Sequence, residues 1–199
     1  MTPGPHMEAE MQVPALVPVP LEPGPDPIAA LLQEGRHREA LAACVRAHGA
    51  VLGRLCMALL GSQADADEAT QETLLRAHRA MATYRGEGSV KAWLCGIARH
   101  VCAHALETRR RGRQLLEVVP GPDEVSPDEL ARRQQAKLLR DALARLKPTE
   151  REALVLRYVA ELSHREIAAA CNLDEAAARK RISRALARLR AVVPHELLA

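Results

Sequence analysis

One aperiodic stretch divides the sequence into two segments with helical periodicity. Residues 112–127 are rich in glycine and proline and have no regular apolar pattern, which is typical of a link between domains. On both sides of it, apolar residues recur three and four positions apart, as they do along helices with one buried face. We therefore expect a disordered proline-rich tail at residues 1–27 and a first domain at residues 28–111. A flexible linker at residues 112–127 would join it to a second domain at residues 128–199.

The side chains available for a core restrict the fold class further. Aromatic residues make up only 2% of the chain and phenylalanine is absent, although 48% of the residues are hydrophobic. Leu, Ala, Val and Ile must therefore form any core, and a sequence rich in Ala, Leu, Arg and Glu favours helix over sheet. We expect an all-α protein made of two small helical domains.

The cysteines lack the spacing of a disulfide framework or a zinc site. There are five of them and no Cys-x-x-Cys pair, which argues against both. Cys95, His100, Cys102 and His104 lie close in sequence, but at about 100° per residue of helix their side chains diverge and cannot meet at one ion. We expect small buried cysteines, no metal and no cofactor, with redox or metal sensing as the less favoured alternative.

Other features that would suggest a membrane protein or an enzyme are absent from the sequence. No run of about 18 apolar residues predicts a membrane span, and the N-terminus lacks the basic-then-apolar order of a secretory signal. There is no glycine-rich phosphate loop, nucleophile constellation or pair of catalytic carboxylates. We expect a cytoplasmic protein that does not insert into membranes, is not an enzyme and has no small-molecule substrate.

Helix-start signals in the second half predict closely spaced helices. Thr149 with Glu152, and Ser163 with Glu166, each match a capping box, in which a hydroxyl and a carboxylate satisfy amide groups at the start of a helix. Asn172 lies at a turn that often requires a positive φ, which asparagine tolerates. Two short helices joined by such a turn predict a helix-turn-helix.

The helix expected after this turn carries cations on one side. Arg179, Lys180 and Arg184 are predicted to face outward, while Ala178 and Ile182 face inward. The net charge of the chain is only +3, so the local concentration of cations is more informative than the total. Such a helix can enter the major groove of DNA; the alternative is an amphipathic hairpin with a solvated basic face.

Two segments resemble regions 2 and 4 of sigma-70-type sigma factors, in that order. The second segment, residues 143–189, contains LKPTEREALVLRY and SHREIA; the first, residues 31–111, contains DADEATQETLLRA, YRGEG and AWLCGIAR. A chain with these two regions and a short linker resembles an extracytoplasmic-function, or group IV, sigma factor. The resemblance implies binding to core RNA polymerase and promoter DNA, and an anti-sigma factor as a further partner.

The resemblance also implies which residues contact each partner. An acidic helix of region 2 would bind a coiled coil of the largest polymerase subunit through Asp67, Glu68, Gln71, Glu72, Leu75 and Arg76. The minus-ten element would be held and opened by Tyr84, Lys91, Trp93, Arg99, His100, His104, Arg109 and Arg110. The minus-thirty-five element would be recognised by Arg165, Glu175, Ala177, Arg179, Lys180, Arg181 and Arg184.

The sequence departs from the family pattern at both DNA sites. His100 and His104 stand where the strand-opening helix often has Asn and Asp. In the recognition helix, Ser, Gly, Thr and Val are commoner at the positions of Asp174, Glu175 and Ala176–Ala178. Glu175 could accept a hydrogen bond from a cytosine amino group or repel phosphate. The alternative function is that of a conventional helix-turn-helix regulator with an N-terminal sensing or dimerisation domain.

Overall fold

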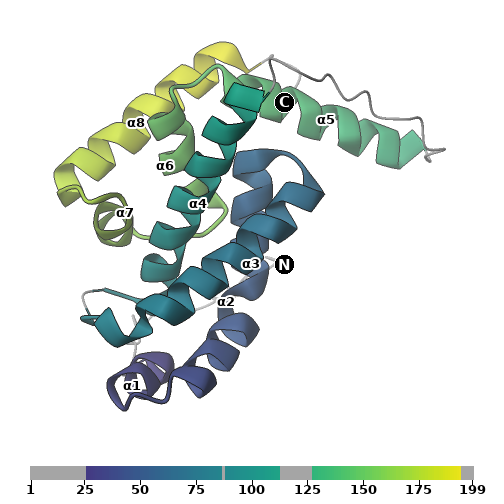
Figure 1. Ribbon diagram of the computed structural model, residues 1–199. Coiled ribbons are helices and arrows are strands. Elements are labelled where there is room, and N and C mark those ends of the chain that lie inside the picture. Colours follow the sequence, from purple (N-terminus) through teal and green to yellow (C-terminus); the bar gives the residue numbers. More distant parts are fainter. Residues whose placement is uncertain (1–25, 87, 113–126, 194–199) are drawn as a thin grey trace, which may run out of the picture.

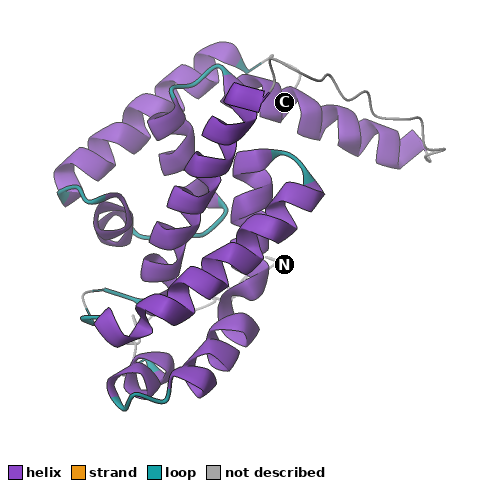
Figure 2. Cartoon of the chain, in the orientation of Figure 1, coloured by secondary structure: helices purple, strands orange, loops and turns teal. Residues whose placement is uncertain are grey.

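The computed structural model describes residues 26–86, 88–112 and 127–193 (Figure 1). Every regular element in these ranges is helical, and loops without strands connect the helices (Figure 2). The prediction of an all-α fold is therefore confirmed for this part of the chain. Most of the predicted tail and of the predicted linker lies outside the described residues.

The first half of the described chain is a bundle around one long helix. Its elements are α1 (Pro27–Gln33), α2 (His37–Leu60), α3 (Gln63–Ala80), the 3-10 turn η1 (Met81–Thr83) and α4 (Val90–Gly112). By length and composition alone α2 could cross a membrane. It packs instead against α3 and α4, with Leu52, Leu55 and Cys56 fully buried, so it is the central helix of the bundle.

The second half consists of four further helices, α5 (Pro127–Ala144), α6 (Pro148–Tyr158), α7 (His164–Cys171) and α8 (Glu175–Val192). α6, α7 and α8 pack on one another, whereas α5 extends outward from them (Figure 1). Their core is formed by Leu156, Ile167, Ala178 and Ala185, each with at most a trace of exposed surface. The inward side of α8 is therefore the one predicted from its apolar spacing.

The helix-turn-helix is confirmed at the residues that define its ends. The Glu166 amide donates to Ser163 Oγ at 3.2 Å, and the Ser163 amide donates to Glu166 Oε2 at 2.8 Å, which is the predicted capping box. Asn172 ends α7 with a φ of 53°. Asp174 begins α8 by accepting the Ala177 amide on its Oδ1 at 2.7 Å.

The predicted capping box of Thr149 with Glu152 is wrong. α6 begins at Pro148, whose fixed φ and missing amide hydrogen suit the first helical position, so Lys147 takes the cap position. Glu150 then lies three residues after the cap, and its Oε2 accepts the Lys147 amide at 3.3 Å. Glu152 is not used for capping and makes a different contact, described below.

The two halves pack against each other. α4 contacts α7 and α2 contacts α6, so that buried residues from both halves belong to one hydrophobic cluster. Figure 1 shows α4 lying between the α2–α3 pair and the helices α6 to α8. The domain bounds 28–111 and 128–199 stay a prediction.

We expect the cysteines to react slowly with a disulfide reagent in the folded protein. All five are buried, and burial is the main cause that raises the pKa of Cys44 to about 11 and that of Cys95 to about 12. Because the thiolate is the reactive form, these two thiols should react at pH 8 at least about 100-fold more slowly than in denaturant. Timed labelling with and without guanidinium measures this, and equal rates would show that the thiols are accessible.

Candidate protein and nucleic-acid interfaces

A groove between α3 and α4 collects most of the residues assigned to polymerase binding. This α3 groove has a volume of about 580 Å³ and is lined by α3 residues Glu68, Gln71, Glu72, Leu75 and Arg76, opposite Val101, His104 and Arg109 of α4. Asp67 does not line the groove; its Oδ1 accepts a hydrogen bond from Gln63 Nε2 at 2.8 Å. The predicted set is therefore brought together except for Asp67.

The α3 groove combines charge with an exposed leucine. Arg76 Nε donates to Glu72 Oε1 at 2.6 Å, and this hydrogen bond lowers the pKa of Glu72. Leu75 lies beside the pair with 52% of its surface exposed. An apolar side chain ringed by charged groups is the composition of a protein interface with a hydrophobic centre and a polar rim.

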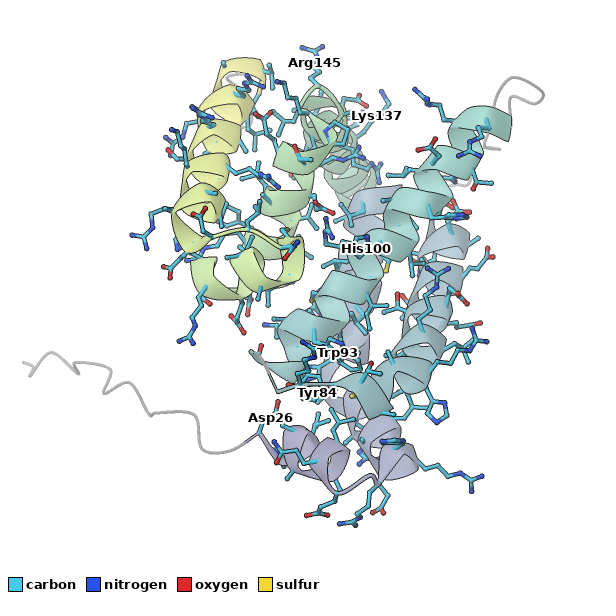
Figure 3. The ribbon with its side chains drawn as sticks, turned by 60° about the vertical axis from the view of Figure 1, so that its left-hand side comes forward. Asp26, Tyr84, Trp93, His100, Lys137 and Arg145 are labelled. Atoms are coloured by element: carbon cyan, nitrogen blue, oxygen red, sulfur yellow. The ribbon has the colours of Figure 1, made fainter. Side chains whose placement is uncertain are left out.

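Tyr84 and Trp93 form an aromatic pair at the start of α4 (Figure 3). Their ring centroids lie 5.1 Å apart with the planes tilted by 58°, and the Tyr84 hydroxyl donates to the Gly88 carbonyl at 3.1 Å. Both side chains are half-buried. Each ring thus packs against the other, and neither is an isolated ring on which a DNA base could stack.

A second groove separates α4 from α7. This α7 groove, of about 450 Å³, is lined by Trp93, Arg99 and His100 on α4 and by Ala169, Ala170, Cys171 and Asn172 on the other side. Arg99 Nη1 lies 2.7 Å from His100 Nε2. Partial burial and the charge of Arg99 lower the pKa of His100, which favours the neutral imidazole.

The residues assigned to the minus-ten element do not lie on one surface. His104 lines the α3 groove, and Arg109 donates to the Leu60 carbonyl at 3.1 Å and pairs with Asp65, so its guanidinium anchors the end of α4. Arg110 is exposed and lines a cleft between α4 and α6. Trp93, Arg99 and His100 line the α7 groove, and Tyr84 contacts Trp93, whereas Lys91 is not among the lining residues.

The outward face of α8 presents a shallow polar surface. It is formed by Glu175, Ala176, Arg179, Lys180 and Ser183. Glu175 Oε1 accepts a hydrogen bond from Arg179 Nη2 at 2.7 Å, so in this structure the carboxylate orients an arginine.

The remaining residues assigned to the minus-thirty-five element differ in exposure. Arg165 on α7 and Arg184 on α8 are exposed, whereas Ala177 and Arg181 are half-buried. The exposed assigned cations therefore lie on both helices of the helix-turn-helix.

Sequence reasoning missed two polar contacts between the halves. Arg99 Nε donates to Glu152 Oε1 at 2.9 Å, and Ser89 Oγ donates to Glu166 Oε1 at 2.5 Å. Within the described residues, no three His, Cys, Asp or Glu side chains are grouped as metal ligands would be. Only Glu152 could have indicated such a contact from the sequence. Once Pro148 is taken as the first residue of α6, the Glu152 carboxylate has no role in capping the helix and is free to bind another group.

The family assignment follows from comparison with known proteins. Residues 44–112 match the family model of sigma-70 region 2, and residues 136–189 match that of sigma-70 region 4. The ECF RNA polymerase sigma factor SigL of Mycobacterium tuberculosis is 31% identical over 150 residues, which cover 72% of this chain and 82% of SigL. The fold and these matches define a sigma-70-type protein. The chain belongs to the extracytoplasmic-function sigma factors.

Other comparisons agree with this assignment. SigG of the same organism is 31% identical over 166 residues, 70% of this chain, but only 45% of SigG is covered, so the chain spans about half the length of that relative. The structure of CnrH in complex with the cytosolic domain of CnrY matches with a TM-score of 0.62 and 27% identity, over 83% of this chain and 94% of CnrH. The sigma factor RpoE of Bartonella quintana, in complex with the anti-sigma factor NepR, matches with a TM-score of 0.55 and 25% identity. The match covers 77% of this chain and 93% of RpoE. A conventional helix-turn-helix regulator is not favoured.

Proposed function

We propose that the chain directs core RNA polymerase to specific promoters and assists promoter opening. The observation that carries this proposal is the match of one chain to both sigma-70 region 2 and sigma-70 region 4. The region 2 match includes the α3 groove and the minus-ten residues of α4, and the region 4 match includes the outward face of α8. The α3 groove would bind polymerase, the outward face of α8 would recognise the minus-thirty-five element, and α4 with its preceding loop would open the minus-ten element.

The chemistry of each surface suits its proposed partner. Arg179 and Lys180 can contact guanine edges or phosphates in the major groove, with Glu175 orienting Arg179. Lys91 and Arg99 can contact the backbone of the opened strand.

The proposal assigns no reaction to the chain itself. Nucleotide transfer would be performed by the polymerase, so we propose a non-enzymatic protein that acts in the cytoplasm without a cofactor. Because the neighbour RpoE was solved with an anti-sigma factor, we also propose an anti-sigma partner for this chain.

Run-off transcription with purified core polymerase tests the proposal. We expect transcripts that begin at discrete positions on promoter fragments only when the chain is added, because core polymerase alone does not select promoters. Duplex DNA binding without polymerase is measured on the same fragments. Tight sequence-specific binding by the chain alone, together with no run-off product, would contradict the proposal and support a conventional regulator.

Substitutions on the outward face of α8 should affect only the upstream element. We expect Arg179→Ala or Lys180→Ala to reduce transcription from promoters that depend on the minus-thirty-five element, with a loss of about 1–3 kcal/mol in discrimination where a base contact is removed. Polymerase binding should persist because α8 lies outside the α3 groove. Arg190→Ala, an exposed arginine further along the same helix, is the matched control; an equal loss there would indicate a general charge effect.

A further inference from the structure

The cleft between α4 and α6 has the size of a small-molecule site. Its volume is about 530 Å³, within the range of about 300–1,000 Å³ that is usual for such sites. This α6 cleft is lined by side chains of both helices and by Leu59 of α2. The function proposed above assigns no ligand to it.

Both carboxylates that line the α6 cleft already have cationic partners. Arg99 Nε donates to Glu152 Oε1 at 2.9 Å, in a pair that is largely withdrawn from solvent, with side-chain exposures of 17% and 15%. Arg111, which does not line the cleft, donates from its Nη2 to Glu107 Oε1 at 3.1 Å. Neither carboxylate is therefore available to neutralise a further cation on the cleft walls.

Two more arginines line the cleft, one from each helix. Among the described residues, neither Arg110 of α4 nor Arg151 of α6 pairs with a carboxylate. The Nε of Arg151 is buried and has no hydrogen-bond partner, whereas buried polar groups in native proteins nearly always have one. An unsatisfied buried donor costs stability, so the fold alone does not account for an arginine at this position.

The rest of the lining suits an anion that also has an apolar part. Thr149 lies in the first turn of α6, where backbone amides have no partner within the helix and negative charge is stabilised. A guanidinium binds phosphate through two parallel hydrogen bonds. Leu59, Ala103 and Leu106 add aliphatic surface to the same cleft, against which a ring can pack.

We propose that the α6 cleft binds a phosphorylated small molecule with a ring, of the nucleotide class. Its phosphates would bind Arg110, Arg151 and the first turn of α6, and its ring would pack on the aliphatic lining. Two cations without carboxylate partners favour a ligand with at least two negative charges, which a polyphosphate has and a single carboxylate does not. Binding in this cleft does not depend on the proposed function.

Isothermal titration calorimetry of the full chain with three probes tests the ligand class. The probes are ATP, inorganic tripolyphosphate, which has the phosphates without the ring, and adenosine, which has the ring without the phosphates. We expect ATP to bind more tightly than tripolyphosphate, and adenosine to show no measurable binding. Equal affinities for ATP and tripolyphosphate would overturn the ring contact, and absence of binding by both would overturn the site.

Arg151→Met tests the location, because it removes the guanidinium and keeps an unbranched side chain. We expect the affinity for ATP to fall at least about tenfold, as when a hydrogen bond to a charged group is lost. The thermal midpoint should not fall, since the buried Nε has no hydrogen bond to lose. Arg110→Met, at an exposed residue of α4, should weaken ATP binding too and provides a second test if Arg151→Met is poorly folded.

Arg145→Met is the matched control. Arg145 is an exposed arginine in the turn between α5 and α6 (Figure 3) and does not line the cleft, so the affinity for ATP should change by less than about twofold. An equal loss in Arg145→Met and Arg151→Met would show a general charge effect and overturn the site.

A single-stranded oligonucleotide of random sequence distinguishes the source of the phosphates. If Arg151→Met weakened binding of this oligonucleotide while the unsubstituted chain did not bind ATP, the cleft would be a contact for the nucleic-acid backbone, and the small-molecule proposal would be overturned. Run-off transcription by the unsubstituted chain tests the proposed function separately, whatever the calorimetry shows.

Discussion

Replacing Leu75 by Asp is expected to weaken binding to core RNA polymerase by at least about tenfold, which corresponds to about 1.4 kcal/mol. The leucine has 52% of its surface exposed and lies in the α3 groove among the charged side chains of Glu68, Glu72 and Arg76. Apolar anchors at the centre of an interface contribute most of the binding free energy. The substitution also adds a negative charge beside Glu68 and Glu72. The free energy of unfolding should change by less than about 1 kcal/mol, because about half of the side chain is already in solvent.

Val45→Asp provides the control for this experiment. Val45 is a similarly exposed apolar residue, at 46%, on α2 and outside the α3 groove. Co-purification with core polymerase and urea unfolding are measured for both variants. Equal retention of the two by polymerase would remove the α3 groove from the interface, whereas a large loss of stability in Leu75→Asp would show that the residue is structural.

Replacing Ile167 by Ala is expected to destabilise the helix-turn-helix by about 2–5 kcal/mol, the usual cost of such a cavity in a core. Ile167 has no exposed surface and lies on α7, which contacts both α6 and α8. The core of the second half is aliphatic, and the chain has no phenylalanine that could fill the cavity. Promoter recognition through α8 should therefore be lost at a temperature at which the first half stays folded.

Thermal and urea unfolding, followed by helical circular dichroism, measure this effect. Leu139→Ala on α5 is the control, because that leucine is 45% exposed and its truncation should leave the midpoint nearly unchanged. If Ile167→Ala unfolded no earlier than the control, the packing of α7 in this structure would be wrong.

The parts of the fold that depend on neighbouring residues were predictable from the sequence. The cap at Ser163, the left-handed turn at Asn172 and the start of α8 at Asp174 each depend on hydrogen bonds within a few residues, and all three are found. The Thr149 prediction failed because Pro148 is the first residue of α6, so the cap is Lys147, two residues earlier than predicted. Thr149 and Glu152 have the spacing of a capping box, but the preference of Pro148 for the first helical position is stronger.

The positions of site residues around α4 were only partly predictable. Helical geometry gives the angle between two side chains but not which neighbour lies at that angle. His104 is rotated by only about 40° from His100, yet His104 lines the α3 groove and His100 the α7 groove. The contact of Arg99 with Glu152 could not be predicted, since it depends on how two distant helices pack.

Glu166 uses its two carboxylate oxygens for different purposes. Oε2 accepts the amide and hydroxyl of Ser163 within the helix-turn-helix, while Oε1 accepts the hydroxyl of Ser89. The cap of α7 is therefore made within the second half and does not depend on the contact with Ser89. A partner that displaced Ser89 would leave the start of α7 hydrogen-bonded as it is.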